Sequence, residues 1–285
     1  MTRPLRYCLY REIDSPGKYD IRGSVSTGDY TWTPQNFAGF YYDIDHDVGT
    51  ETLTATLSDN KLSGDVYPYG LVYETTAQQM PFKFQDWGSY YVMGFLGEKC
   101  FAGYIEGSDS EEGYLFDKST DRSVLDKGQL LKVLADDDTE KTITSDSSLK
   151  LDEGYELALK SVDIDGNKAY FELSKNGTVI DYRALQPSKD AATMADKTYY
   201  YKNPQVGGQK NLVTIAVHFR NAFNGAGQSI ATIDGIWQIS DSPIEVRPDT
   251  QYDKMTVATA DAGNGVITMT IKTIPLCSAG TKILC

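Results

Sequence analysis

Histidine is almost absent from this chain of 285 residues, and the scarcity limits the enzyme chemistry open to it. The sequence contains only two, His46 and His218. A zinc site with three histidine ligands is therefore impossible, and the HExxH motif of metalloproteases does not occur. A serine hydrolase would need one of these histidines as its general base. The sequence has no GxSxG elbow, although other catalytic triads need none.

Cysteine is also rare, and its spacing argues against a zinc site. None of the 4 cysteines belongs to a CxxC pair, which is the spacing that such sites commonly use. Cys100, within GEKCFAG, lies among apolar residues, so we expect it to fill a small space in the core. Cys277 and Cys285 are close enough in the sequence to form a disulfide, and free thiols near the end of the chain are the alternative.

Long apolar runs and positive charge are lacking too. No segment approaches the ~20 apolar residues that a membrane helix needs. The start of the chain is charged throughout and lacks the apolar middle of a signal peptide, so we expect either an intracellular protein or an excised piece of a longer chain. The 27 Lys and Arg against 40 Asp and Glu leave a net charge of −13. Because this charge repels phosphates and anionic membranes, we expect no nucleic-acid partner.

Helix signals are scarce, whereas alternation with a period of two is common. Apolar residues alternate with threonine over 52–57, and with polar or small residues over 213–219, where His218 falls on the polar face. This pattern is typical of half-buried strands. Short helical turns are expected only within 123–134 and 187–196. The predicted fold class is all-β, built from antiparallel β-sandwiches.

Asn176-Gly177 is the first of two hairpin signals in the middle of the chain. Asn-Gly favours a two-residue turn, because both positions need a positive φ. A simple turn of this kind would place Leu173 opposite Ile180 and Phe171 opposite Tyr182. The apolar residues of the two strands would then share one side of the sheet.

Asp165-Gly166 is the second hairpin signal, and it requires a bulge. Without an extra residue, the turn would place Lys160 opposite Phe171. A bulge at Lys160-Ser161 restores Leu159 opposite Phe171 and Leu157 opposite Leu173, so apolar residues again meet across the strands.

An internal sequence repeat favours two similar domains. Residues 244–271 follow the same plan as residues 149–173: a short strand, a polar turn, a tyrosine, an alternating strand, an Asp/Gly/Asn turn and a return strand. In the second copy Val257 would face Met269 and Met255 would face Ile271. Two copies of one supersecondary unit indicate two related β-domains.

Asp43, Asp45 and Asp47 form an alternating acidic run that could bind Ca²⁺ or another hard cation. They match the first ligand positions of a calcium loop. The full pattern departs at two points, because Gly49 comes one position late and the twelfth position is Thr54 instead of Glu. The alternative is a solvated acidic turn.

Asn176 also begins the sequon Asn-Gly-Thr, so it is a candidate for glycosylation if the chain is exported. The hairpin requires the same Asn-Gly pair, so turn formation is the first interpretation.

The aromatic residues could serve a sugar-binding surface, with Trp32, Trp87 and Trp237 as platforms. Burial in the core is the more common state of tryptophan.

Three blocks of sequence together resemble a known family. They are RGSVSTGDYTWTPQNFAGFYYDID with GTETL (22–53), KVLADDDTEKTITSDSSLKLDEGYELALKSVDIDGNKAYFELSKNGTVID (132–181) and AFNGAGQSIATIDGIWQISD (222–241). In this order they are similar to the S-layer family duplication domain of methanogenic archaea. The ends, 1–16 and 274–285, lie outside the resemblance.

The resemblance implies a coat protein with no enzymatic activity and no cofactor. Such proteins are expected at the extracellular cell surface, where they self-associate into a porous two-dimensional lattice held by a C-terminal membrane anchor. This chain lacks the signal peptide and the anchor, so we expect one excised module or an atypical relative. The net charge of −13 would give the pores acidic walls.

The resemblance also implies that each module contains two similar antiparallel β-sandwich domains. Because of the internal sequence repeat, we expect 17–123 with 242–273 to form the first domain and 124–241 to form the second. A simple division into two halves is the alternative.

Two other functions compete with that of a coat protein. They are an extracellular carbohydrate-binding or glycoside-cleaving β-sandwich and a calcium-dependent adhesion module.

Overall fold

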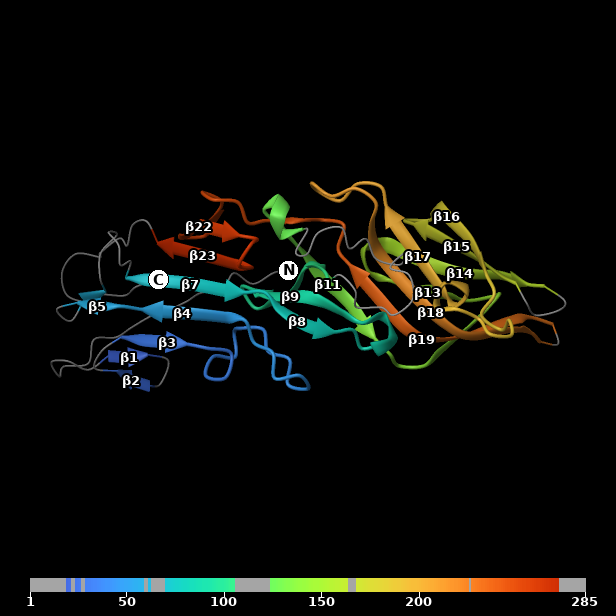
Figure 1. Cartoon of the computed structure of the whole chain (residues 1–285), viewed down its shortest axis with the longest axis horizontal. Coiled ribbons are helices and arrows are strands. Elements are labelled where there is room, and N and C mark those ends of the chain that lie inside the picture. Colours follow the sequence, from blue (N-terminus) through green and yellow to red (C-terminus); the bar gives the residue numbers. More distant parts are fainter. Residues whose placement is uncertain are drawn as a thin grey trace. The chain divides into compact units, whose positions relative to one another are not determined.

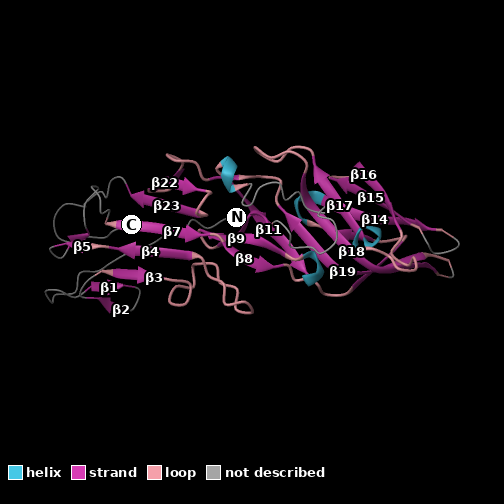
Figure 2. Ribbon diagram, viewed as in Figure 1, coloured by secondary structure: helices cyan, strands magenta, loops and turns pink. Residues whose placement is uncertain are grey.

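Antiparallel strands make up most of the described part of the chain, as Figures 1 and 2 show. The structure is a computed structural model that describes residues 19–21, 24–26, 29–58, 61–62, 70–105, 124–163, 168–225 and 227–271. Its helical elements within these ranges are α1 (Met194–Lys197) and the 3₁₀ turns η1 (Gln85–Trp87), η2 (Leu125–Lys127) and η3 (Asp152–Gly154). None of the described helices is long and apolar enough to cross a membrane. The predicted all-β fold is confirmed.

The described chain separates into two compact units. Unit 1 takes the described residues up to Thr76, Gly94–Glu98, and the described residues from Val246 onward. Unit 2 takes Ala77–Met93 and the described residues of Lys99–Glu245.

Unit 1 is built on a six-stranded antiparallel sheet with strand order β21-β22-β23-β7-β4-β3, accompanied by the two-stranded ribbons β1-β2 and β5-β6. The strands are β1 (Tyr19–Ile21), β2 (Ser24–Ser26), β3 (Tyr30–Trp32), β4 (Glu51–Ala55), β5 (Leu57–Ser58), β6 (Lys61–Leu62), β7 (Leu71–Thr76), β21 (Gln251–Tyr252), β22 (Met255–Asp261) and β23 (Val266–Ile271). Val257 pairs with Met269 and Met255 with Ile271, as predicted.

Alternation along β4 and β7 directs one face of this sheet inward. Leu53 and Ala55 are buried while Thr52 and Thr54, which alternate with them, are half-exposed, and Tyr73 is buried on the neighbouring strand. Phe40, from the loop before β4, packs edge-to-face on Tyr73 with ring centroids 6.1 Å apart. The aromatic run before the acidic residues therefore contributes to the core of unit 1.

Unit 2 combines a nine-stranded sheet with a four-stranded sheet. The larger sheet has strand order β17-β18-β19-β11-β10-β9-β8, with β12 also paired to β19 and β20 to β11, and the smaller has order β13-β14-β15-β16. The strands are β8 (Gln78–Pro81), β9 (Ser89–Phe95), β10 (Glu98–Tyr104), β11 (Gln129–Asp137), β12 (Lys141–Thr144), β13 (Ser148–Lys150), β14 (Tyr155–Val162), β15 (Ala169–Lys175), β16 (Thr178–Leu185), β17 (Thr198–Asn203), β18 (Leu212–Asn224), β19 (Ser229–Ile239) and β20 (Ile244–Glu245).

A shared apolar core holds the two sheets of unit 2 together as a β-sandwich. It joins inward residues of β13–β16, including Leu157 and Leu173, to inward residues of β17–β19, including Ile215 and Ile233. Phe171 of β15 stacks on Phe219 of β18 with ring centroids 4.1 Å apart. Burial of each such side chain contributes about 1.5–3 kcal/mol, so the core is the main source of stability in this unit.

The bulge predicted in β14 is confirmed. The pairing of β14 with β15 shifts register between Leu159 and Ser161, which places Leu159 opposite Phe171 and Leu157 opposite Leu173. The extra residue, Lys160, is exposed. The apolar pattern dictates this register because a shift of one residue would turn every core side chain to the solvent.

The register predicted across the Asn176-Gly177 turn is wrong by one residue. A second bulge between Leu173 and Ser174 pairs Leu173 with Asp181 and Phe171 with Arg183. The inward Asp181 accepts a hydrogen bond of 2.6 Å from the Tyr199 hydroxyl, and the Arg183 guanidinium lies 3.7 Å from the centroid of the Tyr200 ring. These tyrosines of β17 satisfy the inward charges, and Ile180 and Tyr182 are exposed instead.

The half-buried pattern predicted for 213–219 is also wrong, because both faces of β18 are buried there. One face lies in the sandwich core, and an aromatic cluster around Trp237 covers the other. Trp237 is fully buried and pairs with Ala216 across β18 and β19. Phe82 and Tyr90 pack on its indole with centroids 4.8 and 4.6 Å away.

Candidate functional site

The acidic run from Asp43 to Asp47 forms a tight turn in unit 1. The backbone N–H of Asp43 donates to the Val48 carbonyl at 2.8 Å, and the Val48 N–H donates back to the Asp43 carbonyl at 3.1 Å. This pair closes a loop of four residues, and Asp47 adopts a positive φ of 52° within it. Aspartate tolerates this left-handed conformation better than most residues do, so the acids fit the geometry of the turn.

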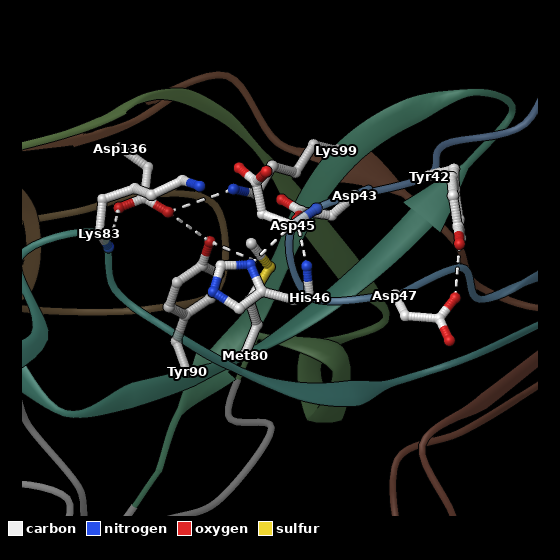
Figure 3. A network of polar contacts seen from close by, with 10 residues as sticks. All are labelled: Tyr42, Asp43, Asp45, His46, Asp47, Met80, Lys83, Tyr90, Lys99 and Asp136. Atoms are coloured by element: carbon white, nitrogen blue, oxygen red, sulfur yellow. Dashed lines mark hydrogen bonds and ion pairs between the residues drawn. The ribbon is translucent and has the colours of Figure 1, made fainter.

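The carboxylate of Asp43 organises the turn from inside, as Figure 3 shows. Its Oδ1 accepts the backbone N–H of Asp45 at 3.1 Å and that of His46 at 3.0 Å, and it lies 2.9 Å from Nδ1 of His46. This is the local side-chain-to-backbone bonding that favours Asp in turns.

Asp47 has a different partner. Its Oδ1 accepts a hydrogen bond from the Tyr42 hydroxyl, and this bond to a carboxylate raises the pKa of Tyr42. Asp43, Asp45 and Asp47 were predicted to share a cation. Two of them, Asp43 and Asp47, instead accept hydrogen bonds from different partners. The described residues contain no group of three or more His, Cys, Asp or Glu side chains suited to a metal ion. Calcium binding at Asp43, Asp45 and Asp47 stays a prediction.

Glu51 is a buried acid that the sequence reasoning missed. It begins β4 in phase with Leu53 and Ala55, and its side chain is fully buried. Its Oε1 accepts the Tyr73 hydroxyl at 2.8 Å and the Gly97 N–H at 2.9 Å, while Oε2 accepts the Tyr41 N–H at 2.7 Å. Desolvation raises the pKa of Glu51, although these donors act in the opposite direction. The period-two phase of β4 was the signal that could have revealed it.

Gly94 leaves the space that the Glu51 carboxylate occupies. A Cβ atom at position 94 would lie 2.5 Å from Oε2. Glu51 thus connects the loop before β4, strand β7 and the turn at Gly94–Glu98 within unit 1. These hydrogen bonds hold the three segments together, which is a structural role for Glu51.

Asp136 plays a comparable part in unit 2, also drawn in Figure 3. From β11 it accepts the Tyr90 hydroxyl at 2.9 Å, the Lys83 N–H at 2.9 Å and Nζ of Lys99 at 3.2 Å. Tyr90 belongs to β9 and Lys99 to β10, so one nearly buried carboxylate links three successive strands of the nine-stranded sheet.

His218 is buried, which corrects the expectation that it lies on a polar surface. Its Nδ1 contacts a carboxylate oxygen of Asp234, and the ring of Phe84 stacks on the imidazole with centroids 4.3 Å apart. Desolvation lowers the pKa of His218, although Asp234 acts in the opposite direction. The other histidine, His46, lies in unit 1 beside Asp43. Each imidazole therefore has an aspartate as its neighbour and belongs to local packing.

Asn176 lies at the exposed tip of the β15–β16 hairpin. Its φ of 50° and the φ of 80° at Gly177 are those that an Asn-Gly turn requires. The Asn176 N–H donates to the carbonyl of Gly154 at 2.8 Å. The residues of the sequon are all exposed, and glycosylation of Asn176 stays a prediction.

All three tryptophans are buried. Trp32, Trp87 and Trp237 expose 3%, 1% and 0% of their surface, so none of them offers a flat exposed ring to a sugar.

Cys100 is buried in β10, as expected of a small core residue. Cys8, Cys277 and Cys285 lie outside the described residues.

Comparison with known proteins gives these structural sites a family context. The sequence model of the family described as S-layer protein matches residues 22–282. The chain is 34% identical over 243 residues to a major S-layer protein of Methanosarcina mazei, and 36% identical over 242 residues to one of Methanosarcina acetivorans. It is also 32% identical over 239 residues to one of Methanosarcina barkeri.

These alignments cover 82–84% of this chain but 32% of each relative. The chain thus spans about a third of the length of the curated relatives that it matches. Since the match covers most of its residues, this chain belongs to the S-layer protein family.

Proposed function

We propose that this chain is a structural module of a protein that forms a porous layer on the outer cell surface. The family match over residues 22–282, with relatives named major S-layer proteins, is the observation that supports the proposal most strongly. The module would act through its shape and its contacts with other copies, without catalysing a reaction.

The chemistry of the buried acids agrees with a structural role. Glu51 and Asp136 accept hydrogen bonds from the protein's own backbone and side chains. Fully bonded polar groups in a core favour one rigid arrangement of the strands around them. A rigid module is what a regular lattice needs, since every copy must present the same contact surfaces.

The net charge of −13 supports a further part of the proposal. We infer that pores between modules have acidic walls, which admit cations and small solutes and hinder large or anionic ones. Charged rims of one sign create a potential that discriminates between ions in this way.

We also propose that the chain is an internal duplication of two similar β-sandwich domains, with 17–123 and 242–273 as the predicted first domain and 124–241 as the second. The compact units differ from this division, because they place 77–93 and 99–105 with the second domain. The similar hairpin plans of 149–173 and 244–271 support this inference. Superposition of the two hairpins in a high-resolution experimental structure tests it, and unrelated strand registers would count against it.

Asn176 is the proposed glycan attachment site. Its position at an exposed turn supports the proposal, because the side chain is accessible to a modifying enzyme. Mass spectrometry of the protein from its native envelope should show a glycan mass on the peptide that contains Asn176. An unmodified peptide would reject the assignment.

The experiment that tests the structural role is reassembly. The whole protein, released from its envelope with denaturant, is dialysed into buffer and imaged by electron microscopy. We expect ordered sheets, whereas soluble monomers or disordered precipitate under all conditions would contradict the proposal. A glycan array run on the same material should show no saturable sugar binding.

A further inference from the structure

Exposed apolar side chains gather on the β15–β16 hairpin of unit 2. Among the residues whose side chains are described, seven large hydrophobic or aromatic ones are exposed, and four of these belong to the hairpin. They are Tyr170, Val179, Ile180 and Tyr182, with 44%, 49%, 39% and 83% of their surface exposed. This set is called the hairpin patch below. Such a concentration on a folded domain marks a contact surface more often than chance.

The strand register explains why these side chains face outward. Phe171 and Leu173 of β15 face the core, so Tyr170 and Glu172 face the opposite side. Tyr182 pairs with Glu172 and therefore shares that outer side. The bulge in β15–β16 leaves Ile180 without a cross-strand partner in the register. The sheet itself thus presents the patch, and no fluctuation is needed to expose it.

β16 is the last strand of its four-stranded sheet, as the topology shows and Figure 1 illustrates. Its first residues, Thr178 to Ile180, carry no charge. Soluble proteins usually protect such an edge with Lys, Glu, Pro or a bulge, because an open edge pairs readily with another chain; the start of β16 has only the bulge at Ile180. The uncharged start of β16 is therefore available for a specific contact.

Charge on the same outer face is balanced, unlike that of the whole chain. Four ionisable side chains on the outer face of β13–β15 form two ion pairs, Lys150 with Glu156 and Lys160 with Glu172. They sum to zero, whereas the chain carries −13. Two copies that approach through this face meet less repulsion than through an average surface. Exposed ion pairs contribute only about 0–1 kcal/mol each, so they can exchange partners with those of a neighbour.

We propose that the hairpin patch is a docking surface for a second copy of this chain. The inference rests on the proposed lattice function and names one surface that would build it. A second copy fits because the charges on this face sum to zero, so two copies can approach through it without the repulsion that the net charge of −13 causes elsewhere. A contact of one patch with the same patch on a second copy has two-fold symmetry.

Tyr182→Glu tests the proposal, with Ile44→Glu as the matched control. Ile44 is 81% exposed, nearly the same as Tyr182, and lies in unit 1. Both substitutions change the net charge equally and remove an exposed apolar side chain. Both variants should melt within about 2 °C of the parent, since exposed substitutions rarely cost more than about 0.5 kcal/mol.

Self-association of the whole protein is measured by analytical ultracentrifugation, and sheet formation by electron microscopy. We expect Tyr182→Glu to weaken association at least about tenfold, as loss of a central aromatic contact does, and Ile44→Glu to change it less than about twofold. Tyr182→Gln should show a smaller loss in the same direction, which separates the missing ring from the added charge.

The outcomes distinguish this inference from the broader one. Normal sheets from both the parent and Tyr182→Glu would overturn the docking surface and leave the lattice function standing. Equal losses in Tyr182→Glu and Ile44→Glu would assign the effect to general repulsion and also overturn it. If the parent forms no sheets or oligomers, the lattice function fails and the docking surface fails with it. Capture of a different protein by the patch, lost in Tyr182→Glu while self-association persists, would assign it to another partner.

Discussion

Two carboxyl groups of unit 1 show how burial decides what an acid does at the scale of single residues. Asp43 and Glu51 each accept backbone N–H groups, but Asp43 stays within its own turn while Glu51 collects donors from three distant segments. Loss of a local bond affects one turn, whereas loss of a buried acceptor leaves several donors unsatisfied. Substitution of the two residues should therefore have different consequences.

Replacement of Glu51 by Gln should lower the free energy of unfolding by about 1–3 kcal/mol at pH 7. One carboxylate oxygen becomes an NH₂ group that faces a backbone N–H, so a buried acceptor is lost and two donors oppose each other. Denaturant unfolding followed by tryptophan fluorescence measures the change. A variant as stable as the parent would contradict the structural role of Glu51.

The pH dependence of this effect has a definite sign. The pKa of Glu51 is raised in the folded state by desolvation, so the folded protein holds this proton more tightly than the unfolded chain does. The contribution of Glu51 to stability is then greatest below its unfolded pKa and falls as the pH rises through the folded pKa. The stability difference between parent and Glu51→Gln should be larger at pH 5 than at pH 7. A smaller difference at pH 5 would contradict the raised pKa.

Asp43 can be tested with a pair of substitutions. Asp43→Asn keeps an oxygen that accepts the N–H groups of Asp45 and His46, so its melting temperature should stay close to that of the parent. Asp43→Ala removes that oxygen and should cost about 1 kcal/mol. The same melts with calcium and with chelator test the cation, since a ligand bound only to the folded state must raise the melting temperature. A calcium-dependent rise that Asp43→Asn abolishes would assign these acids to a metal site.

The residue scale is also where sequence reasoning was weakest. The acidic run was predicted as either a cation site or a turn, and the bonds of Asp43 within the turn could not be read from composition. Glu51 was missed although its phase with Leu53 and Ala55 was visible, because an acid in a core is rare. His218 was placed on a polar face because alternation cannot tell which strand is covered on both sides.

The elements follow the apolar pattern wherever that pattern faces the core. The bulge at Lys160 could be predicted because it alone brings Leu159 opposite Phe171. The second bulge, after Leu173, could not, because it depends on tertiary contacts. It turns Asp181 and Arg183 inward. There Asp181 accepts a hydrogen bond from the Tyr199 hydroxyl, and the Arg183 guanidinium lies over the Tyr200 ring. The contacts of Asp181 and Arg183 with the tyrosines of β17 therefore decide the register, although Ile180 and Tyr182 lose the burial that apolar side chains favour.

A neighbouring pair in β15 tests the sandwich core. Phe171 exposes 1% of its surface and stacks on Phe219, whereas the next residue before it, Tyr170, exposes 44%. Phe171→Ala should cost about 3–5 kcal/mol because it leaves a cavity between the two sheets. Tyr170→Ala, the control, should cost less than about 1 kcal/mol. Equal effects in chemical denaturation would contradict the strand orientation described here.

The whole molecule combines an acidic composition with a sheet face of balanced charge. The balance on the outer face of β13–β15 depends on the bulge at Lys160, which the sequence predicts, and on the pairing of β13 with β14, which the sequence pattern did not specify. The all-β fold could be predicted, since helix signals were few and alternation was frequent. The family resemblance pointed to a surface layer, and the matches to major S-layer proteins agree with it.

Acidic pores should make reassembled sheets selective for charge. Anionic probes should pass more slowly than cationic probes of equal size at low salt. The difference should nearly vanish in 1 M salt, where the Debye length falls to about 3 Å. Filtration rates through supported sheets measure it. Equal rates for both probes at low salt would rule out acidic walls and leave the lattice itself untouched.

Electron microscopy of cell surfaces that carry the whole protein is the most direct test of the structural role. We expect a periodic two-dimensional lattice that contains the protein, identified by labelled antibody, and that disappears when the protein is stripped from the envelope. Protein located at the surface without periodic order, or found only inside the cell, would contradict the structural role.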